Sequence, residues 1–82
     1  MQYSVQFKPR AMKDLAALSQ ENRRRILAKI EGLQDNLAGD VKRLTNFTPE
    51  YRLRVGDYRI LFEINNSMII IYRVKHRRNA YS

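Results

Sequence analysis

Residues 51–62 read Tyr51-Arg52-Leu53-Arg54-Val55-Gly56-Asp57-Tyr58-Arg59-Ile60-Leu61-Phe62. Apolar and cationic residues alternate on both sides of the central Gly-Asp pair, and alternation with a period of two is typical of half-buried strands. Two such strands joined by two residues that begin with Gly predict a hairpin with a type II′ turn. In this register Val55 lies opposite Tyr58 and Arg54 lies opposite Arg59.

Three arginines, Arg52, Arg54 and Arg59, therefore share one face of the predicted hairpin. Like charges placed opposite each other destabilise a sheet, so this arrangement suggests an anion that offsets the repulsion. The planar guanidinium group is well shaped for paired hydrogen bonds to phosphate. The alternative is a solvated sheet face, although such a face would be expected to carry charges of both signs.

Outside the hairpin, hydrophobic periodicity and breaker residues predict the remaining elements. We expect a strand over about residues 2–7, a helix from Pro9 to near Ser19, and a longer helix capped by Ser19 and ended by Gly39-Asp40. Residues 41–50 read as a connecting loop, and strands follow over about 51–55, 58–64 and 68–75. The order β-α-α-β-β-β predicts a single α+β domain, residues 1–82, with two helices packed on one face of an antiparallel sheet.

The second turn decides which way the last strand faces. A three-residue loop, Asn65-Asn66-Ser67, sets Arg59 opposite Arg73 and gathers Arg73 and Lys75 with the hairpin arginines. A two-residue loop would move every side chain of the strand to the other face, which puts these two cations into the core. We therefore favour the longer loop. It leaves three apolar residues on the open face, where they could contact a partner: Leu61, Ile69 and Ile71.

The charge balance restricts the classes of partner. Sixteen Lys and Arg residues against eight Asp and Glu give a formal net charge of +8, which favours nucleic acid or an acidic protein. A membrane surface is disfavoured because the cations occur on predicted strands as well as helices, and no apolar run approaches the ~20 residues of a membrane span. No signal peptide is visible. The absence of Cys and the presence of one His argue against a metal site, and no cofactor is expected.

The C-terminal segment supplies two further candidates. His76 adjoins Lys75, Arg77 and Arg78, and a neutral imidazole beside a phosphate site is a candidate acid or base, although a lone His is more often a surface residue. Tyr81 offers an aromatic ring on which an unpaired base could stack. The alternative is that this ring packs on the sheet.

Two motifs, residues 51–64 and 72–81, resemble those of bacterial toxins of the RelE/ParE superfamily, and of its RelE branch in particular. The resemblance extends over nearly the whole chain. It implies a small antiparallel sheet, two N-terminal helices and a short C-terminal helix. It also implies an endoribonuclease that cuts mRNA in the ribosomal A site. A ribose 2′-hydroxyl would attack the adjacent phosphate, with no metal or cofactor.

The resemblance also assigns site residues. By motif position Arg59 contacts the phosphate, Arg77 (or His76 in a shifted alignment) acts as acid, and Tyr81 stacks on a base. Arg52 and Arg54 occupy positions where relatives carry lysines. Because arginine does not lose its proton in proteins, neither can serve as the general base, and we favour His76 for that role. Glu50 and Glu63 are the other possible proton carriers, and Arg73, Lys75 and Arg78 are expected to bind RNA phosphates.

The same resemblance implies a protein neutralised by a cognate antitoxin, acidic, partly disordered and RelB-like, and the absence of Cys fits a reducing cytoplasm. The free toxin is expected to be monomeric and its complex larger. Two alternatives remain open at this point. A ParE-like protein would inhibit DNA gyrase without ribonuclease chemistry, and a nucleic-acid-binding module would bind RNA without cleaving it.

Overall fold

The predicted hairpin is confirmed in a computed structural model that describes residues 2–81. Strand β3 (Tyr51–Val55) pairs antiparallel with β4 (Tyr58–Asn65), and Val55 lies opposite Tyr58. Gly56 has a φ of 58°, and a Cβ there would lie 2.7 Å from Nη2 of Arg25. Glycine suits this turn both because it adopts positive φ without strain and because it leaves room for Arg25.

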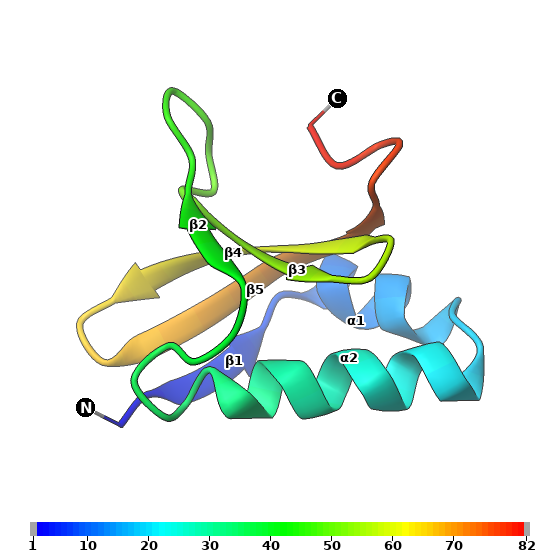
Figure 1. Ribbon diagram of the computed structural model, residues 1–82, viewed down its shortest axis with the longest axis horizontal. Coiled ribbons are helices and arrows are strands. Elements are labelled where there is room, and N and C mark those ends of the chain that lie inside the picture. The colour runs from blue at the N-terminus through cyan, green and yellow to red at the C-terminus, as the bar shows by residue number, and fades with distance from the viewer. Residues whose placement is uncertain (1, 82) are drawn as a thin grey trace.

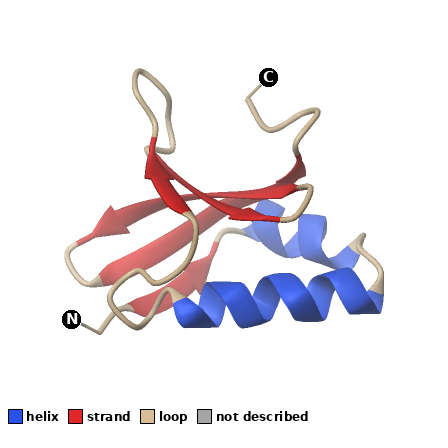
Figure 2. Ribbon diagram, in the orientation of Figure 1, coloured by secondary structure: helices blue, strands red, loops and turns tan. Residues whose placement is uncertain are grey.

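The hairpin belongs to a five-stranded sheet with the order β1-β5-β4-β3-β2 (Figure 1). The added strands are β1 (Ser4–Phe7), β2 (Val41–Arg43) and β5 (Met68–His76). The helices α1 (Pro9–Ala16) and α2 (Gln20–Gly32) lie on one side of the sheet, as Figure 2 shows. The α+β class is thus confirmed. The sheet is mixed rather than wholly antiparallel, because β1 runs parallel to β5.

The helix boundaries follow from local signals. Pro9 occupies the start of α1, where its missing N–H costs nothing. The hydroxyl of Ser19 accepts a hydrogen bond from the Asn22 N–H at 3.2 Å and caps α2 as predicted. Helix α2 ends at Gly32, earlier than expected, and positive φ angles at Asn36 and Leu37 turn the chain toward β2.

The core lies between the helices and the adjacent sheet face. Its fully buried large side chains come from α2, from the residue that caps its C-terminal end and from three strands, with less than 2 % of each exposed: Ile26, Leu33, Leu53, Ile60, Phe62, Ile69 and Ile71. Along β3 and β4 the buried residues alternate with the arginines, so the arginines point to the opposite face. None of the helices among residues 2–81 is both long and apolar enough to cross a bilayer.

The predicted three-residue turn after β4 is wrong. Asn65 pairs with Met68, so the loop is the two-residue segment Asn66-Ser67, with Asn66 at a φ of 58°. A two-residue loop alone would put Lys75 on the core face, and a β-bulge prevents this. Phe62 pairs with Ile71 and Leu61 with Arg73, which leaves Tyr72 as the extra residue. A bulge inserts one residue and so reverses the alternation beyond it. Arg59 therefore lies opposite Lys75, not opposite Arg73.

The bulge also changes which apolar residues are exposed. Ile69 and Ile71 precede it and are completely buried in the core, contrary to the prediction that they form part of an open docking face. Leu61 points to the face opposite the helices, but it is only 3 % exposed. The three residues therefore offer no exposed row to a partner.

The segment 41–50 is not only a loop. Val41–Arg43 forms β2, which pairs antiparallel with β3 and extends the sheet by one strand. The remainder of the segment rises from the sheet on the side opposite the helices, and the C-terminal tail lies on that side too (Figure 1). Residues 77–81 form turns, so the short C-terminal helix implied by the family resemblance is absent from the described residues.

Arg73 leaves the cationic face and binds α1. Its Nε donates to Oδ2 of Asp14 at 2.8 Å and its Nη2 donates to Oδ1 at 3.1 Å. The Val74 N–H donates to Oδ2 at 2.9 Å. Burial raises the pKa of Asp14, but these hydrogen bonds and the nearby cations together lower it by more than burial raises it. The pKa of this carboxyl therefore lies below its ordinary value.

We expect Asp14→Asn to lower the free energy of unfolding by about 1–3 kcal/mol, because the three charge-assisted hydrogen bonds to its carboxylate are weakened in a partly buried site. A carboxyl whose pKa is lower in the folded chain than in the unfolded chain stabilises the folded state at pH values above its unfolded-state pKa. This stabilisation is lost as the pH falls through the folded-state pKa. Wild type should therefore lose stability below about pH 4 more steeply than the variant. Thermal denaturation at several pH values measures both effects. The exposed Asp57, in Asp57→Asn, is the control, and equal losses in both variants would contradict the prediction.

Candidate phosphate- and base-binding site

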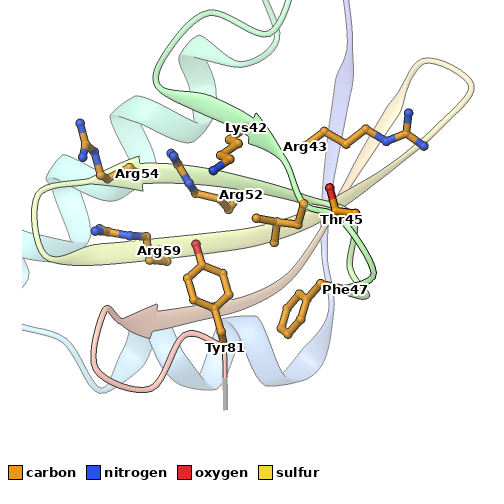
Figure 3. A pocket seen from close by; sticks show the side chains of 9 residues that line it. Lys42, Arg43, Thr45, Phe47, Arg52, Arg54, Arg59 and Tyr81 are labelled. Carbon is orange, nitrogen blue, oxygen red and sulfur yellow. The ribbon is translucent and has the colours of Figure 1, made fainter.

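A pocket of about 550 Å³ opens on the sheet face opposite the helices. Figure 3 shows its wall formed by strands β2, β3 and β4, with the loop after β2 and the tail closing one side. Its lining residues are predominantly cationic and aromatic: Lys42, Arg43, Leu44, Thr45, Phe47, Arg52, Arg54, Arg59 and Tyr81. Among residues 2–81, no Asp or Glu lines it.

Strand register brings the cations together. Lys42 lies opposite Arg52, and Arg54 lies opposite Arg59. Lys75 continues the row on β5 as the partner of Arg59. Since paired residues of neighbouring strands point to the same face, these five cations form the charged surface that the hairpin arginines predicted. Lys75 lies on this surface as expected, although it is not among the residues that line the pocket.

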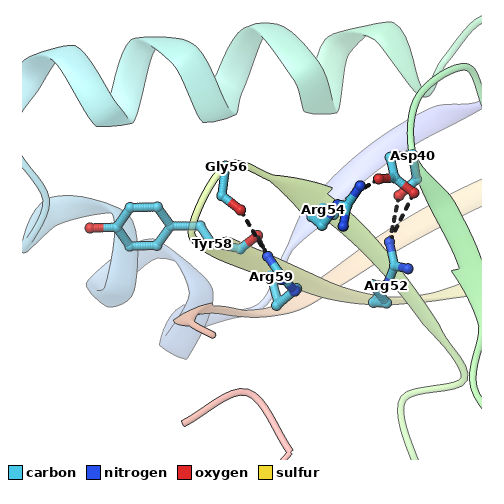
Figure 4. A network of polar contacts seen from close by, with 6 residues as sticks. All are labelled: Asp40, Arg52, Arg54, Gly56, Tyr58 and Arg59. Atoms are coloured by element: carbon cyan, nitrogen blue, oxygen red, sulfur yellow. Dashed lines mark hydrogen bonds and ion pairs between the residues drawn. The ribbon is translucent and has the colours of Figure 1, made fainter. Parts of the chain in front are cut away.

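Asp40 holds two of the arginines at the edge of the pocket (Figure 4). Nη1 of Arg52 donates to Oδ1 of Asp40 at 3.1 Å and to its backbone oxygen at 2.9 Å, while Nε of Arg54 lies 2.6 Å from Oδ2. The hydrogen bond from Arg52 is the main cause of a lowered pKa of Asp40, and the charge of Arg54 adds to it. Asp40 thus orients both guanidinium groups and partly neutralises them.

Arg59 is positioned differently. Its Nη1 donates to the backbone oxygens of Gly56 at 2.9 Å and Tyr58 at 3.0 Å, as Figure 4 shows. Within residues 2–81 it makes no ion pair with a carboxylate. The carbonyl groups fix the guanidinium without cancelling its charge, and its Nε and Nη2 donors are left for a ligand. Arg59 is therefore the best-placed group for an incoming anion.

Two aromatic rings form the other side of the pocket. Phe47 from the loop after β2 and Tyr81 from the tail meet edge to face, with ring centroids 5.5 Å apart and planes at 82°. The Tyr81 side chain remains about half exposed (49 % for the residue). In Figure 3 its hydroxyl points toward the arginine row. The site therefore presents cations for a phosphate next to a ring surface suited to an unpaired base.

Besides Lys75, four predicted site residues lie outside this pocket. His76 projects to the helix side, where its ring meets Tyr58 edge to face at 5.7 Å, and its Nδ1 accepts a hydrogen bond from the Arg78 N–H. Arg77 lies at the hairpin turn, with Nε 3.8 Å from Asp57 Oδ1. Arg78 is exposed on the tail, and Arg73 is held by Asp14. The prediction that Arg73 joins the hairpin arginines is wrong because Asp14 of α1 binds its side chain, although Arg73 pairs with Leu61 in the sheet.

Sequence reasoning missed the contribution of residues 40–47. Lys42 and Phe47 belong to the segment read as a loop, Asp40 ends the helix predicted before it, and the structure brings each of them to the site. The sequence signal for a strand here was the apolar–polar alternation of Val41 and Lys42, directly after Gly39-Asp40 ends the predicted helix. A strand of three residues is too short to be recognised by periodicity alone.

The cationic and aromatic lining of the pocket is suited to binding an anion and a base. The planar guanidinium group of an arginine can donate paired hydrogen bonds to phosphate oxygens, and the exposed face of the Tyr81 ring can stack on a base. In the part of the chain that is described, no three His, Cys, Asp or Glu side chains come together as metal ligands.

Asp40→Asn is expected to tighten binding of short single-stranded RNA and to make it more salt-dependent. The substitution removes a negative charge next to Arg52 and Arg54. Each arginine that gains a phosphate contact should steepen the plot of log affinity against log salt by about 0.7. Fluorescence anisotropy at several salt concentrations measures the slope. Glu31→Gln, an equal charge change on the exposed surface of α2, is the control. The same slope change in both variants would refute a local role for Asp40.

Comparison with known proteins relates this chain to toxins of toxin–antitoxin systems. Residues 5–81 match the sequence profile of the family described as the ParE toxin of the type II toxin–antitoxin system parDE. The chain is 38 % identical to Toxin RelE3 of Methanocaldococcus jannaschii, and the alignment covers 94 % of this chain and 93 % of that protein.

Solved structures of toxin–antitoxin complexes contain the same fold. The RelB–RelE complex of Methanococcus jannaschii includes a chain with 38 % identity and a TM-score of 0.75, covering 92 % of this chain and 93 % of that one. The archaeal RelE–RelB complex of Pyrococcus horikoshii includes one with 30 % identity and a TM-score of 0.76, covering 98 % and 100 %. The resemblance inferred from the two motifs is confirmed, and this chain belongs to the ParE/RelE family of type II toxin–antitoxin toxins, with RelE-like relatives.

Proposed function

We propose that this chain is a ribosome-dependent endoribonuclease that cleaves mRNA in the A site and thereby inhibits translation in the cytoplasm. The observation that carries the proposal is the convergence of Arg52, Arg54 and Arg59 on one pocket beside the exposed ring of Tyr81. This combination suits a scissile phosphate with an unpaired base next to it. A protein that only binds another protein has no evident need for both features.

The RNA supplies its own nucleophile. In the proposed reaction the ribose 2′-oxygen attacks the adjacent phosphorus in line, and the P–O5′ bond breaks. The products are a 2′,3′-cyclic phosphate and a 5′-hydroxyl end. The protein contributes positioning and stabilises the negative charge that accumulates on the phosphate oxygens. Arg59 supplies the uncompensated charge, while Asp40 keeps Arg52 and Arg54 aligned next to it.

We further propose that a cognate antitoxin neutralises the chain. The structures with RelE-like chains described above are complexes with RelB. The net charge of +8 favours an acidic, partly disordered RelB-like segment that folds as it binds. In this proposal the free toxin is monomeric and the complex is larger.

Primer extension on ribosome-bound mRNA tests the proposed activity. We expect cuts within codons positioned in the A site when the protein is added, and no cuts in the same mRNA without ribosomes. Growth arrest without any such cuts would exclude the proposal. Ribosome-free RNA incubated with the protein is the matched control for a general nuclease.

Inhibition of DNA gyrase is the second candidate function. It is favoured by the matched family description, which names a ParE toxin. A supercoiling assay with purified gyrase separates the two candidates, since a ribonuclease leaves supercoiling unchanged. Inhibition of supercoiling, with intact mRNA on the ribosome, would favour gyrase as the target.

A further inference from the structure

The pocket contains abundant positive charge, but most of its cations cannot accept a proton. Four of its residues are arginines, which remain protonated in proteins. The phenol group of Tyr81 is a poor proton acceptor. His76, the residue favoured from sequence, is turned to the other side of the sheet against Tyr58. Attack by a 2′-hydroxyl still requires a group that removes its proton.

Lys42 is the pocket-lining residue that can meet this need. It lies on β2 directly opposite Arg52, and its side chain is exposed. Figure 3 shows its amino group directed into the hollow beside Arg52, whereas the neighbouring Arg43 points away from the other cations. Arg43 is paired with Glu50 at 3.2 Å, and Lys42 makes no ion pair within residues 2–81.

We propose that Lys42 is the general base of the cleavage reaction, an inference that rests on the proposed ribonuclease function. The neutral amine removes the proton of the 2′-hydroxyl as the O2′–P bond forms and the P–O5′ bond breaks. The proton remains on Nζ of Lys42, and water protonates the leaving 5′-oxygen. Lys42 thus provides from β2 the amine that Arg52 and Arg54, two arginines on β3, cannot provide.

Cleavage that uses a lysine as base should depend on pH. The charged and titratable groups that line or edge the same pocket are Asp40, Arg43, Arg52, Arg54, Arg59 and Tyr81. The arginines keep their charge across the working pH range. Because a lysine is active as a base only after losing its proton, cleavage should accelerate as the pH rises.

Lys42→Arg is the decisive variant because it keeps the positive charge and removes the proton acceptor. We expect its single-turnover cleavage of ribosome-bound mRNA to be about 100-fold slower than wild type. Its rate should also change little from about pH 6 to about pH 9, where wild type accelerates. Lys42→Gln should lose activity at least as strongly. The matched control is Lys29→Arg, the same change at an exposed position of α2.

Two further measurements separate the possible causes of a loss. Thermal unfolding and affinity for single-stranded RNA should be the same for Lys42→Arg and wild type, since the substituted side chain is exposed and its charge is conserved. A Lys42→Arg protein with the wild-type rate and pH profile would overturn the inference while leaving the ribonuclease function intact. A wild-type protein that produces no cuts on ribosomes would overturn both.

Discussion

Arg59→Ala is expected to reduce the rate of mRNA cleavage by about 10²–10³-fold and to abolish growth arrest, with little change in stability. Arg59 is the hairpin arginine whose charge no carboxylate offsets within residues 2–81. Its guanidinium is already fixed by the oxygens of Gly56 and Tyr58. A preorganised donor of this kind stabilises developing charge without further reorganisation, which is why its removal should affect the transition state strongly.

Two controls make this result specific. Arg59→Lys retains one positive charge but loses the planar fork, so we expect activity between those of wild type and Arg59→Ala. Arg24→Ala removes an exposed arginine from α2 and should cleave at the wild-type rate. Single-turnover cleavage and thermal unfolding are measured for each variant. Loss of activity that only follows loss of the folded state would argue against a role for Arg59 in phosphate binding.

The hairpin that contains Arg59 was predictable in detail because two independent signals agree. Alternation fixed which side chains share a face, and Gly56-Asp57 fixed the turn, so the register of β3 with β4 followed. The confirmed hairpin arrangement required no long-range information. The helix cap at Ser19 was predictable for the same reason, since the Asn22 N–H that it binds lies within one turn.

The last strand was not predictable in the same way. Residues 68–74 are mostly apolar, so alternation does not distinguish their two faces. The bulge at Tyr72 depends on how β5 packs between β4 and β1, which is a tertiary effect. The position of His76 follows from that bulge, and Lys42 reaches the site only because β2 pairs with β3. The composition of the site was thus partly visible in the sequence, whereas the choice between His76 and Lys42 required the fold.

The aromatic side of the pocket should determine how well RNA is held. Tyr81→Ala is expected to weaken substrate binding by roughly 10–100-fold, because stacking on an aromatic ring contributes about 1–3 kcal/mol per base. Tyr81→Phe keeps the ring and should bind RNA nearly as well as wild type. The concentration dependence of single-turnover cleavage separates this binding effect from the rate effect expected at Arg59.

Phe47 tests whether the two rings act together. Its edge-to-face contact with Tyr81 joins the loop after β2 to the tail, so Phe47→Ala should weaken RNA binding even though Tyr81 is present. If Phe47 acts by holding Tyr81, the double variant should be no weaker than Tyr81→Ala alone, because the two substitutions remove the same stacking surface. Additive losses would instead show that Phe47 contacts the RNA independently. Unchanged binding in Tyr81→Ala would exclude base stacking on this ring.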